Sequence, residues 1–367
     1  MKKRLTIDVI AGARPNFMKV AALFAVRDEF PSLKLRLIHT GQHYDAGMSG
    51  IFLEQLSLPQ PAHHLNVGSA SHATQMAEIM KRYEEWVARN RPDFCLVVGD
   101  VNSTAACALV CAKERIPVGH IEAGLRSFDR TMPEEINRIV TDGISSFLFV
   151  TEESAIQNLR NEGHKAGEIH HVGNVMIDTL FRMLEKAKPL EYYKQLNLKP
   201  QEYAFLTLHR PSNVDNHKVL EEIVENLIWT AREIPILFPV HPRTRKNLES
   251  SGLLTKLNTH KRLILTEPLG YLESLSVFSN ARAVITDSGG LQEETTALKI
   301  PCLTLRNNTE RPITIKQGTN TLIKEDWKLY QNCIKRILEQ SYLTDRENIP
   351  FWDGQTGKRI LNILTEL

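Results

Sequence analysis

Short runs of β-branched and aromatic residues alternate with longer amphipathic segments along most of the chain. One amphipathic segment runs from Thr74 to Arg89, and its apolar residues recur at every third or fourth position, as one face of a helix requires. Strands that alternate with such helices are typical of βα units on a parallel sheet. The pattern therefore predicts an α/β protein.

Two series of strands are predicted. The first series comprises Leu5–Ala11, Lys34–Thr40, Phe94–Gly99, Val118–Ile121, Phe147–Thr151 and Ile169–Val172. The second comprises Tyr203–Leu208, Ile236–Val240, Leu263–Leu265, Ala283–Thr286 and Pro301–Leu305. A charged helical segment separates the two series and ends at Lys199-Pro200. We therefore expect two doubly wound domains, residues 1–175 and 176–349. Ligands should bind at the carboxyl ends of the strands, in a cleft where the two sheets face each other.

The composition is that of an ordinary globular protein, with 42% apolar and 24% charged residues among 367. The net charge of +2 excludes a strong general field for polyanions, so nucleic acid is not an expected partner. No apolar stretch reaches the roughly 18–20 residues of a membrane helix, and Asp8 interrupts the only signal-like start. Five cysteines without zinc spacing predict free thiols, no metal and a cytoplasmic protein.

The segment Thr286–Glu294, TDSGGLQEE, places a small-residue turn between a predicted strand and a helix. Gly289 and Gly290 would let a ligand approach free backbone N–H groups at the helix start, where the helix dipole favours an anion. This predicts a phosphate site that includes Ser288. The alternative is a tight turn with Asp287 or Ser288 as a side-chain cap. Neither a P-loop nor a G-x-G-x-x-G fingerprint is present, which argues against tightly held NAD.

Charged residues also follow three strands of the first series. Arg14 and Lys19 lie at a helix start, where cations are unfavourable unless an anion compensates them. Asp100 and Glu122 each follow a strand directly. Their structural alternatives are a helix cap for Asp100 and an ion pair between Glu122 and Arg126.

The segment Thr131–Arg138 reads TMPEEINR. Thr131 and Glu134 match a capping box, and Arg138 stands at ion-pair spacing from Glu134, so spacing alone favours a structural role here. In the second series, His209 follows a strand and could bind phosphate, carry a proton or hold a loop. His241 repeats this arrangement one unit later.

Seven motifs in order carry a resemblance to a known family. They are GARPNFMK from Gly12, GDVNST from Gly99, HIEAGLRS from His120, MPEEINR from Met132, LHRPSN from Leu208, TDSGGLQEE from Thr286 and NNTERP from Asn307. Together they resemble the non-hydrolysing UDP-N-acetylglucosamine 2-epimerases. The resemblance implies the GT-B fold, with two Rossmann-like domains about a cleft, a C-terminal helix within 350–367 that returns to the first domain, and a homodimer.

The resemblance also implies roles for individual residues. Asp100, Glu122 and Glu134 match the acid/base carboxylates of the family, and His209 matches its catalytic or phosphate-contacting histidine. A larger set of cations and backbone N–H groups would bind the diphosphate and stabilise it as it leaves. The set comprises Arg14, Lys19, Arg138 and the backbone at Ser288, Gly289 and Gly290, and Arg311 would support the same site. Glu294 would bind the ribose hydroxyls. The assignment of Glu134 overrides the structural preference drawn from spacing.

The implied reaction interconverts UDP-GlcNAc and UDP-ManNAc without a cofactor. UDP leaves C1 as C2 loses its proton, and re-addition to the 2-acetamidoglucal occurs from the opposite face, which requires carboxylates near the sugar and cations near the diphosphate. Other readings are an epimerase of UDP-2,3-diacetamido sugars or uronic acids, a hydrolysing relative, a GT-B glycosyltransferase and a nucleotide-sugar binding protein. HRPSN replaces the HRREN of many bacterial members, and residues 68–75 lack their R-Q-T cluster, so activation at a second site is not carried over.

Overall fold

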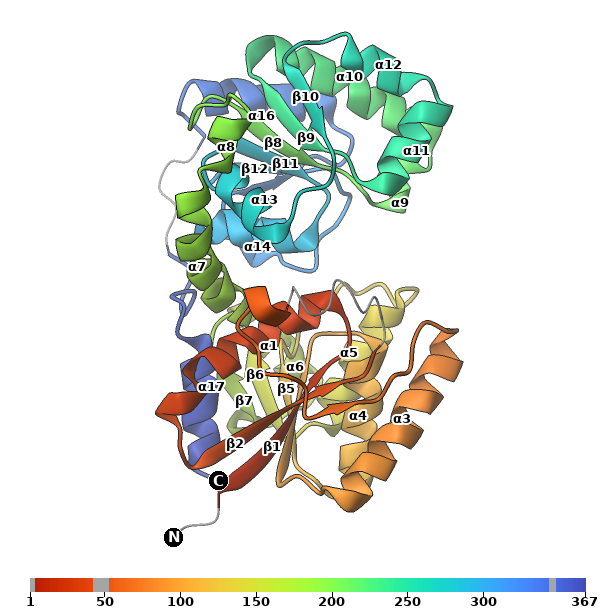
Figure 1. Ribbon diagram of the computed structural model, residues 1–367, viewed down its shortest axis with the longest axis vertical. Coiled ribbons are helices and arrows are strands. Elements are labelled where there is room, and N and C mark those ends of the chain that lie inside the picture. The colour runs from red at the N-terminus through yellow and green to blue at the C-terminus, as the bar shows by residue number, and fades with distance from the viewer. Residues whose placement is uncertain (1–3, 42–52, 343–347) are drawn as a thin grey trace. The chain divides into compact units, whose positions relative to one another are not determined.

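The computed structural model describes residues 4–41, 53–342 and 348–367, except for the side chain of Arg14. Contacts within the chain divide it into two compact units, residues 1–179 with 350–367 and residues 180–349. Each unit is built on one parallel sheet, with seven strands in the first and six in the second (Figure 1). Within the described ranges, every helix is too short or too polar to cross a membrane.

The first unit has the strand order β3-β2-β1-β4-β5-β6-β7. Its strands are β1 (Leu5–Ala11), β2 (Leu33–His39), β3 (His63–His64), β4 (Phe94–Val98), β5 (Val118–Ile121), β6 (Phe147–Val150) and β7 (Ile169–His171). Its helices are α1 (Arg14–Val26), α3 (His72–Arg89), α4 (Asn102–Lys113), α5 (Pro133–Ile144), α6 (Glu153–Asn161), α17 (Thr356–Thr365) and the start of α7 (Val175–Ala187). The order reverses between β1 and β4, where open α/β sheets bind ligands.

The sheet of the first unit is covered on both faces, with α1 and α17 on one and α3 and α4 on the other (Figure 1). The central strand β4 is entirely apolar because neither of its faces meets water, and Phe94–Val98 is buried throughout. Gly119 in β5 is required by close packing, since a Cβ there would lie 2.9 Å from Phe94 and Phe149.

The second unit has the strand order β10-β9-β8-β11-β12-β13. Its strands are β8 (Ala204–Thr207), β9 (Ile236–Pro239), β10 (Leu263–Thr266), β11 (Ala283–Thr286), β12 (Cys302–Thr304) and β13 (Asn320–Leu322). Its helices are α8 (Tyr192–Gln195), α9 (Pro211–Val214), α10 (His217–Glu233), α11 (Pro242–Ser250), α12 (Leu253–Asn258), α13 (Tyr271–Phe278), α14 (Gly289–Ala297), α15 (Ile313–Lys316) and α16 (Trp327–Leu338). Three short 3₁₀ turns, Arg27–Glu29, Ala166–Glu168 and Lys188–Leu190, complete the chain's helical elements as described.

Every predicted strand is confirmed, with each end within one residue of its predicted position. Two edge strands were missed, β3 and β13. The two histidines of β3 and the three residues of β13 are too few to produce an apolar run, and a neighbouring strand defines them instead.

The last helix, α17, packs against α1 within the first unit. Gly357 permits this contact, since a Cβ there would lie only 2.5 Å from the carbonyl oxygen of Ala22. The helix start is held by the buried carboxylate of Asp178, which accepts hydrogen bonds from the backbone N–H groups of Thr356 at 3.1 Å and Gly357 at 2.7 Å. A residue from α7 thus caps a helix almost 180 positions later in the chain.

Asp178→Ala should lower the free energy of unfolding by about 2 kcal/mol, because two buried N–H groups lose their acceptor. Urea denaturation followed by circular dichroism measures this change. Asp353→Ala is the matched control, since its ion pair with Arg359 is about half exposed and should contribute about 0–1 kcal/mol. Equal destabilisation by the two variants would contradict the capping role of Asp178.

Candidate active site

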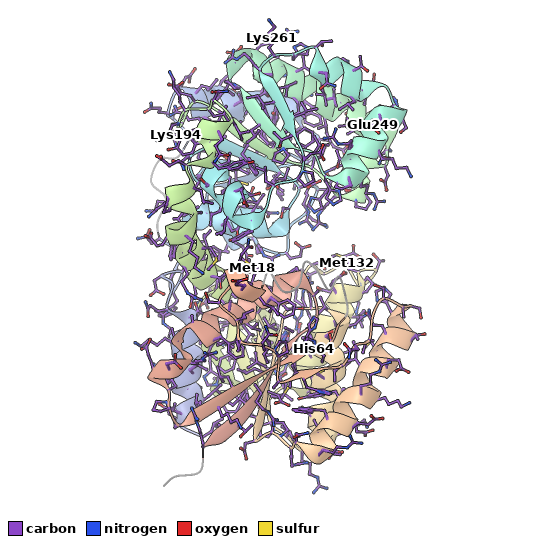
Figure 2. All side chains as sticks on the ribbon, viewed as in Figure 1. Met18, His64, Met132, Lys194, Glu249 and Lys261 are labelled. Carbon is purple, nitrogen blue, oxygen red and sulfur yellow. The ribbon has the colours of Figure 1, made fainter. Side chains whose placement is uncertain are left out.

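The polar residues of the first unit gather where β1, β4 and β5 end. The turns after these strands lead into the segments that carry Lys19, Asp100 and Glu122. Figure 2 shows Met18, the neighbour of Lys19, and Met132, which precedes α5, along this same edge of the unit. The parallel sheet therefore collects residues that are distant in sequence at one edge.

Lys19 and Glu122 form a buried ion pair. Lys19 Nζ lies 2.5 Å from Glu122 Oε2, and the side chains are 10% and 4% exposed. No hydrogen-bond donor among the described residues reaches the other carboxylate oxygen, Glu122 Oε1. Glu122 also has φ of 70°, a left-handed conformation that costs a non-glycine residue on the order of 1 kcal/mol or more. One oxygen is thus held by a cation, while the other is buried and receives no hydrogen bond from the described residues.

Gly99 leaves room for this ion pair. A Cβ on Gly99 would lie 2.8 Å from Lys19 Nζ, and its φ of 70° is one that side chains disfavour. The backbone directly after β4 therefore approaches the lysine closely, immediately before Asp100.

Asp100 is held by Arg138 from α5. The guanidinium contacts Asp100 Oδ2 at 2.5 Å and Glu135 Oε2 at 2.6 Å. Glu135 also accepts the backbone N–H groups of Ser127 and Phe128, both at 2.9 Å. Burial acts to raise the pKa of Glu135, but these N–H groups and Arg138 outweigh it and hold that pKa below its ordinary value. Glu135 is therefore an ionised link between a loop and Asp100.

The structural alternatives raised for this region are wrong. The helix cap of α5 is Met132, without a side-chain bond, because the Thr131 hydroxyl donates to Asp129 instead. Arg138 pairs with Glu135 rather than Glu134. The side chain of Glu134 is half-buried and forms no hydrogen bond or ion pair with the described residues.

Two further alternatives also differ from the structure. Arg126 pairs with Asp142 at 2.7 Å and Glu162 at 2.6 Å, not with Glu122. The N-cap of α4 is Val101, so Asp100 is not a cap. The side chain of Arg14, predicted to contact diphosphate, lies outside the described part of the chain.

In the second unit, His209 is oriented by Asp287. Asp287 Oδ1 lies 2.8 Å from His209 Nδ1, and Oδ2 accepts the backbone N–H groups of His209 and Arg210 at 2.9 and 2.8 Å. Burial acts to raise the pKa of Asp287, but the histidine and the two N–H groups hold it below its ordinary value. The imidazole is 42% exposed, so its Nε2 edge can meet a ligand.

The predicted phosphate turn starts α14. Ser288 is its N-cap, and neither Asp287 nor Ser288 supplies a side-chain cap bond, so that alternative is wrong. The first N–H groups of a helix have no intrahelical acceptor, and here they belong to Gly289 and Gly290. Arg311 lies over this turn, with Nη1 3.3 Å from the place of a Gly289 Cβ, and pairs with Glu293 at 2.8 Å. Cationic and N–H groups therefore converge on one turn.

Glu294 is buried one turn further along α14. Burial raises its pKa to about 7, the neighbouring Glu293 adds to the rise, and the Tyr271 hydroxyl, which donates at 2.7 Å, opposes it. A carboxyl that titrates near neutrality can change charge when a ligand binds beside it.

A cavity of about 290 Å³ adjoins His209 and Ser288. Its wall is mostly apolar and is formed by Phe205, Thr207, Leu208, His209, Pro239, His241, Pro268, Leu269, Ser274, Ser288 and Leu291. It therefore offers an apolar recess next to the anion-binding turn, within the second unit.

Three residues that hold the predicted ones were not predicted from the sequence as site residues: Glu135, Asp287 and Tyr271. Asp287 had a visible signal, since it is an acidic residue directly after a strand, but it was assigned only a capping role. Nothing in the spacing distinguishes Glu135 from Glu134, because their difference arises from which one faces the loop at Ser127.

Comparison with known proteins identifies the family. The family model described as UDP-N-acetylglucosamine 2-epimerase matches residues 26–365. The chain belongs to this family. A UDP-N-acetylglucosamine 2-epimerase from Methanococcus maripaludis is 43% identical over 364 residues, which cover 98% of each chain. A UDP-2,3-diacetamido-2,3-dideoxy-D-glucuronate 2-epimerase from Pseudomonas aeruginosa is 36% identical over 99% of this chain and 100% of that protein.

The fold of the family is also shared. The crystal structure of Methanocaldococcus jannaschii UDP-GlcNAc 2-epimerase in complex with UDP-GlcNAc and UDP matches with a TM-score of 0.85 and 41% identity, covering 99% of this chain and 100% of that one. This likeness and the two parallel sheets of the present protein confirm the predicted GT-B class. That class has two Rossmann-like domains, each with one parallel sheet.

Proposed function

We propose that this protein interconverts UDP-GlcNAc and UDP-ManNAc. The observation that carries the proposal is the whole-chain similarity to the Methanocaldococcus jannaschii enzyme with UDP-GlcNAc and UDP bound. The two polar clusters support it, because one offers carboxylates for proton transfer and the other offers donors for a diphosphate. On this proposal the protein is an isomerase, and no cofactor takes part in the reaction.

The reaction begins with an elimination. A carboxylate accepts the C2 proton, the C2–H electrons form the C1=C2 double bond, and the C1–O bond breaks with its electrons on the departing UDP. Addition of a proton to the opposite face of the 2-acetamidoglucal, with return of UDP to C1, gives the epimer. Atoms and charges balance without an oxidant, so NAD is not needed.

Glu122 suits the role of base, because Lys19 holds one oxygen and Oε1 is without a donor among the described residues. Glu134 is assigned the proton transfer on the opposite face, since no described residue ties up its side chain. Asp100 is fixed by Arg138 and is assigned to the sugar's hydroxyl or acetamido groups. General acid–base groups of this kind typically contribute about 10²–10⁴-fold in rate.

The departing UDP is assigned to the second unit. The N–H groups of Gly289 and Gly290, Arg311 and His209 would stabilise the diphosphate, whose charge grows as the C1–O bond breaks. The cavity beside His209 and Ser288 is proposed to take the uracil ring, and Glu294 the ribose hydroxyls. Lys19, Arg138 and Arg14 remain proposed diphosphate ligands from the first unit.

A product balance tests the proposed activity. We expect UDP-ManNAc to accumulate from UDP-GlcNAc, followed by ³¹P and ¹H NMR, while free UDP stays at trace level. Stoichiometric UDP with free ManNAc would identify a hydrolysing enzyme, and absence of reaction without an added sugar acceptor would favour a glycosyltransferase.

The Pseudomonas aeruginosa relative supports a second substrate, a UDP-2,3-diacetamido uronic acid. The same elimination can act on it, because the reacting atoms C1 and C2 are unchanged. Comparison of kcat/KM for the two UDP-sugars decides between them.

Glu294 makes binding dependent on pH. The ionised carboxylate is the better acceptor for ribose hydroxyls, and its pKa of about 7 is raised mainly by burial. If only the ionised form binds, Kd for UDP-GlcNAc should rise about tenfold from pH 8 to pH 6. The diphosphate diester keeps its charge over this range. Calorimetric titration at both pH values measures the effect, and Glu294→Gln should abolish the pH dependence; a flat profile for the unsubstituted protein would contradict it.

We also propose a homodimer in the cytoplasm. The five cysteines are free and buried, which suits a reducing compartment. Sedimentation velocity separates a 41.7 kDa monomer from a particle of twice that mass.

A further inference from the structure

His120 is a buried histidine of β5 to which the proposed mechanism gives no role. Its side chain is 0% exposed, and each ring nitrogen has a partner from a different element. Nδ1 lies 2.6 Å from Asp142 Oδ1 on α5, and Nε2 lies 2.8 Å from the carbonyl oxygen of Gly99 after β4. Because a carbonyl oxygen can only accept, Nε2 carries a hydrogen and donates it to Gly99.

Asp142 faces His120 as an ionised acceptor. Burial acts to raise the pKa of Asp142, but His120 and Arg126 outweigh it and keep that pKa below its ordinary value. Its second oxygen accepts from Arg126 at 2.7 Å and from the backbone N–H of Gly124 at 3.0 Å. Asp142 therefore joins His120 to Arg126 and to the backbone at Gly124.

These bonds connect the segments that carry the three proposed acids. Gly99 directly precedes Asp100, Gly124 follows Glu122 by two residues, and Asp142 lies on the same helix as Glu134. Glu122 has a left-handed backbone with φ of 70°, which a non-glycine residue keeps only where surrounding contacts hold it. Gly99 has the same φ, which glycine adopts without strain.

We propose that the buried Asp142–His120 pair is a positioning device that fixes the Gly99 and Glu122 turns to α5 and thereby sets the geometry of Asp100, Glu122 and Glu134. This inference rests on the proposed function, because it assumes that these carboxylates act on the sugar. The bond that carries the effect is the one from His120 Nε2 to the Gly99 carbonyl. The bond to Asp142 orients the ring and contributes mainly to stability.

Two substitutions separate the two bonds. The amide nitrogen of Asn reaches about as far from the backbone as Nδ1, so His120→Asn keeps a donor for Asp142 and loses the bond to Gly99. The amide nitrogen of Gln reaches about as far as Nε2, so His120→Gln keeps the bond to Gly99 and loses that to Asp142. Each variant removes one hydrogen bond and the ring, which makes them a matched pair.

The epimerase assay with UDP-GlcNAc is the test. We expect His120→Asn to lower kcat about 100-fold, as small misplacements of reacting groups do, and His120→Gln to lower it less than about tenfold. KM should change less than about threefold in both, because neither substitution touches the UDP contacts assigned to the second unit, at the Gly289–Gly290 turn and Glu294. If His120 were purely structural, the two variants would instead lose kcat equally, and each loss would follow the fall in thermal stability. His164→Asn, at a partly buried histidine 3.6 Å from Glu168, should leave kcat unchanged.

Each outcome decides the question. Equal kcat losses in the two variants, or a larger loss in His120→Gln, would overturn the inference. If His120→Asn does not fold by circular dichroism, His120→Gln decides alone, and a loss of about 100-fold in kcat would count against the bond to Gly99. Inactivity of the unsubstituted protein with both UDP-sugars would overturn the proposed function itself, which is a distinct result.

Discussion

Glu122→Gln is expected to lower kcat for epimerization by about 10³-fold, because the amide cannot accept the C2 proton. The substitution is nearly isosteric, and the amide oxygen can still accept the hydrogen bond from Lys19 that Glu122 Oε2 now takes at 2.5 Å. Substrate affinity should therefore change little, and the loss should fall on kcat rather than on KM. Steady-state kinetics with calorimetric binding of UDP-GlcNAc measures both.

Glu114→Gln is the control for this substitution. Glu114 forms an exposed ion pair with Arg91 in the same unit, so its loss should leave kcat and folding unchanged. If the Glu122→Gln protein folds, binds UDP-GlcNAc and retains more than about a tenth of the kcat of the unsubstituted protein, Glu122 is not the residue that accepts the C2 proton.

Asp287→Asn is expected to lower kcat about 100-fold and the free energy of unfolding by about 2–3 kcal/mol. Asp287 lies 2.8 Å from His209 Nδ1 and accepts hydrogen bonds from two backbone N–H groups and from Asn213 Nδ2 at 3.2 Å. An asparagine offers a single acceptor oxygen and adds a donor. The His209 loop and the imidazole then lose their fixed orientation beside Ser288. Kinetics and chemical denaturation measure the two effects separately.

The control in the second unit is Asp215→Asn, which weakens an exposed pair with Arg243 and should change neither quantity appreciably. Unchanged kcat in a destabilised Asp287→Asn protein would show that His209 needs no fixed orientation.

The fold could be predicted from the sequence because the central strands of both sheets are buried on both faces. Phe94–Val98 and Ala283–Thr286 are continuous apolar runs. Where helices flank such a run, the first and last residues of the strand can be located from the sequence. The strands β3 and β13 could not be found this way, because each is defined by pairing with a neighbouring strand. Pairing partners far away in sequence leave no periodic signal.

The candidate site could be predicted in its positions but not in its contacts. Strand ends located Asp100, Glu122 and His209, since parallel strands expose those positions at one edge. The spacing rules failed at Arg138, where i, i+4 geometry favoured Glu134 but the guanidinium binds Glu135 and Asp100. A long side chain selects among partners by tertiary packing. Local spacing therefore cannot identify which carboxylate stays available for chemistry.

The most direct test of the account is epimerization in D₂O, with C2 of the product and of recovered substrate followed by ¹H NMR and mass spectrometry. The account predicts UDP-ManNAc that carries one deuterium at C2 from its first appearance, without added NAD, because the proton leaves to a side-chain carboxylate that exchanges with solvent. UDP-ManNAc formed with its original C2 hydrogen would contradict proton removal by Glu122 and the elimination it drives.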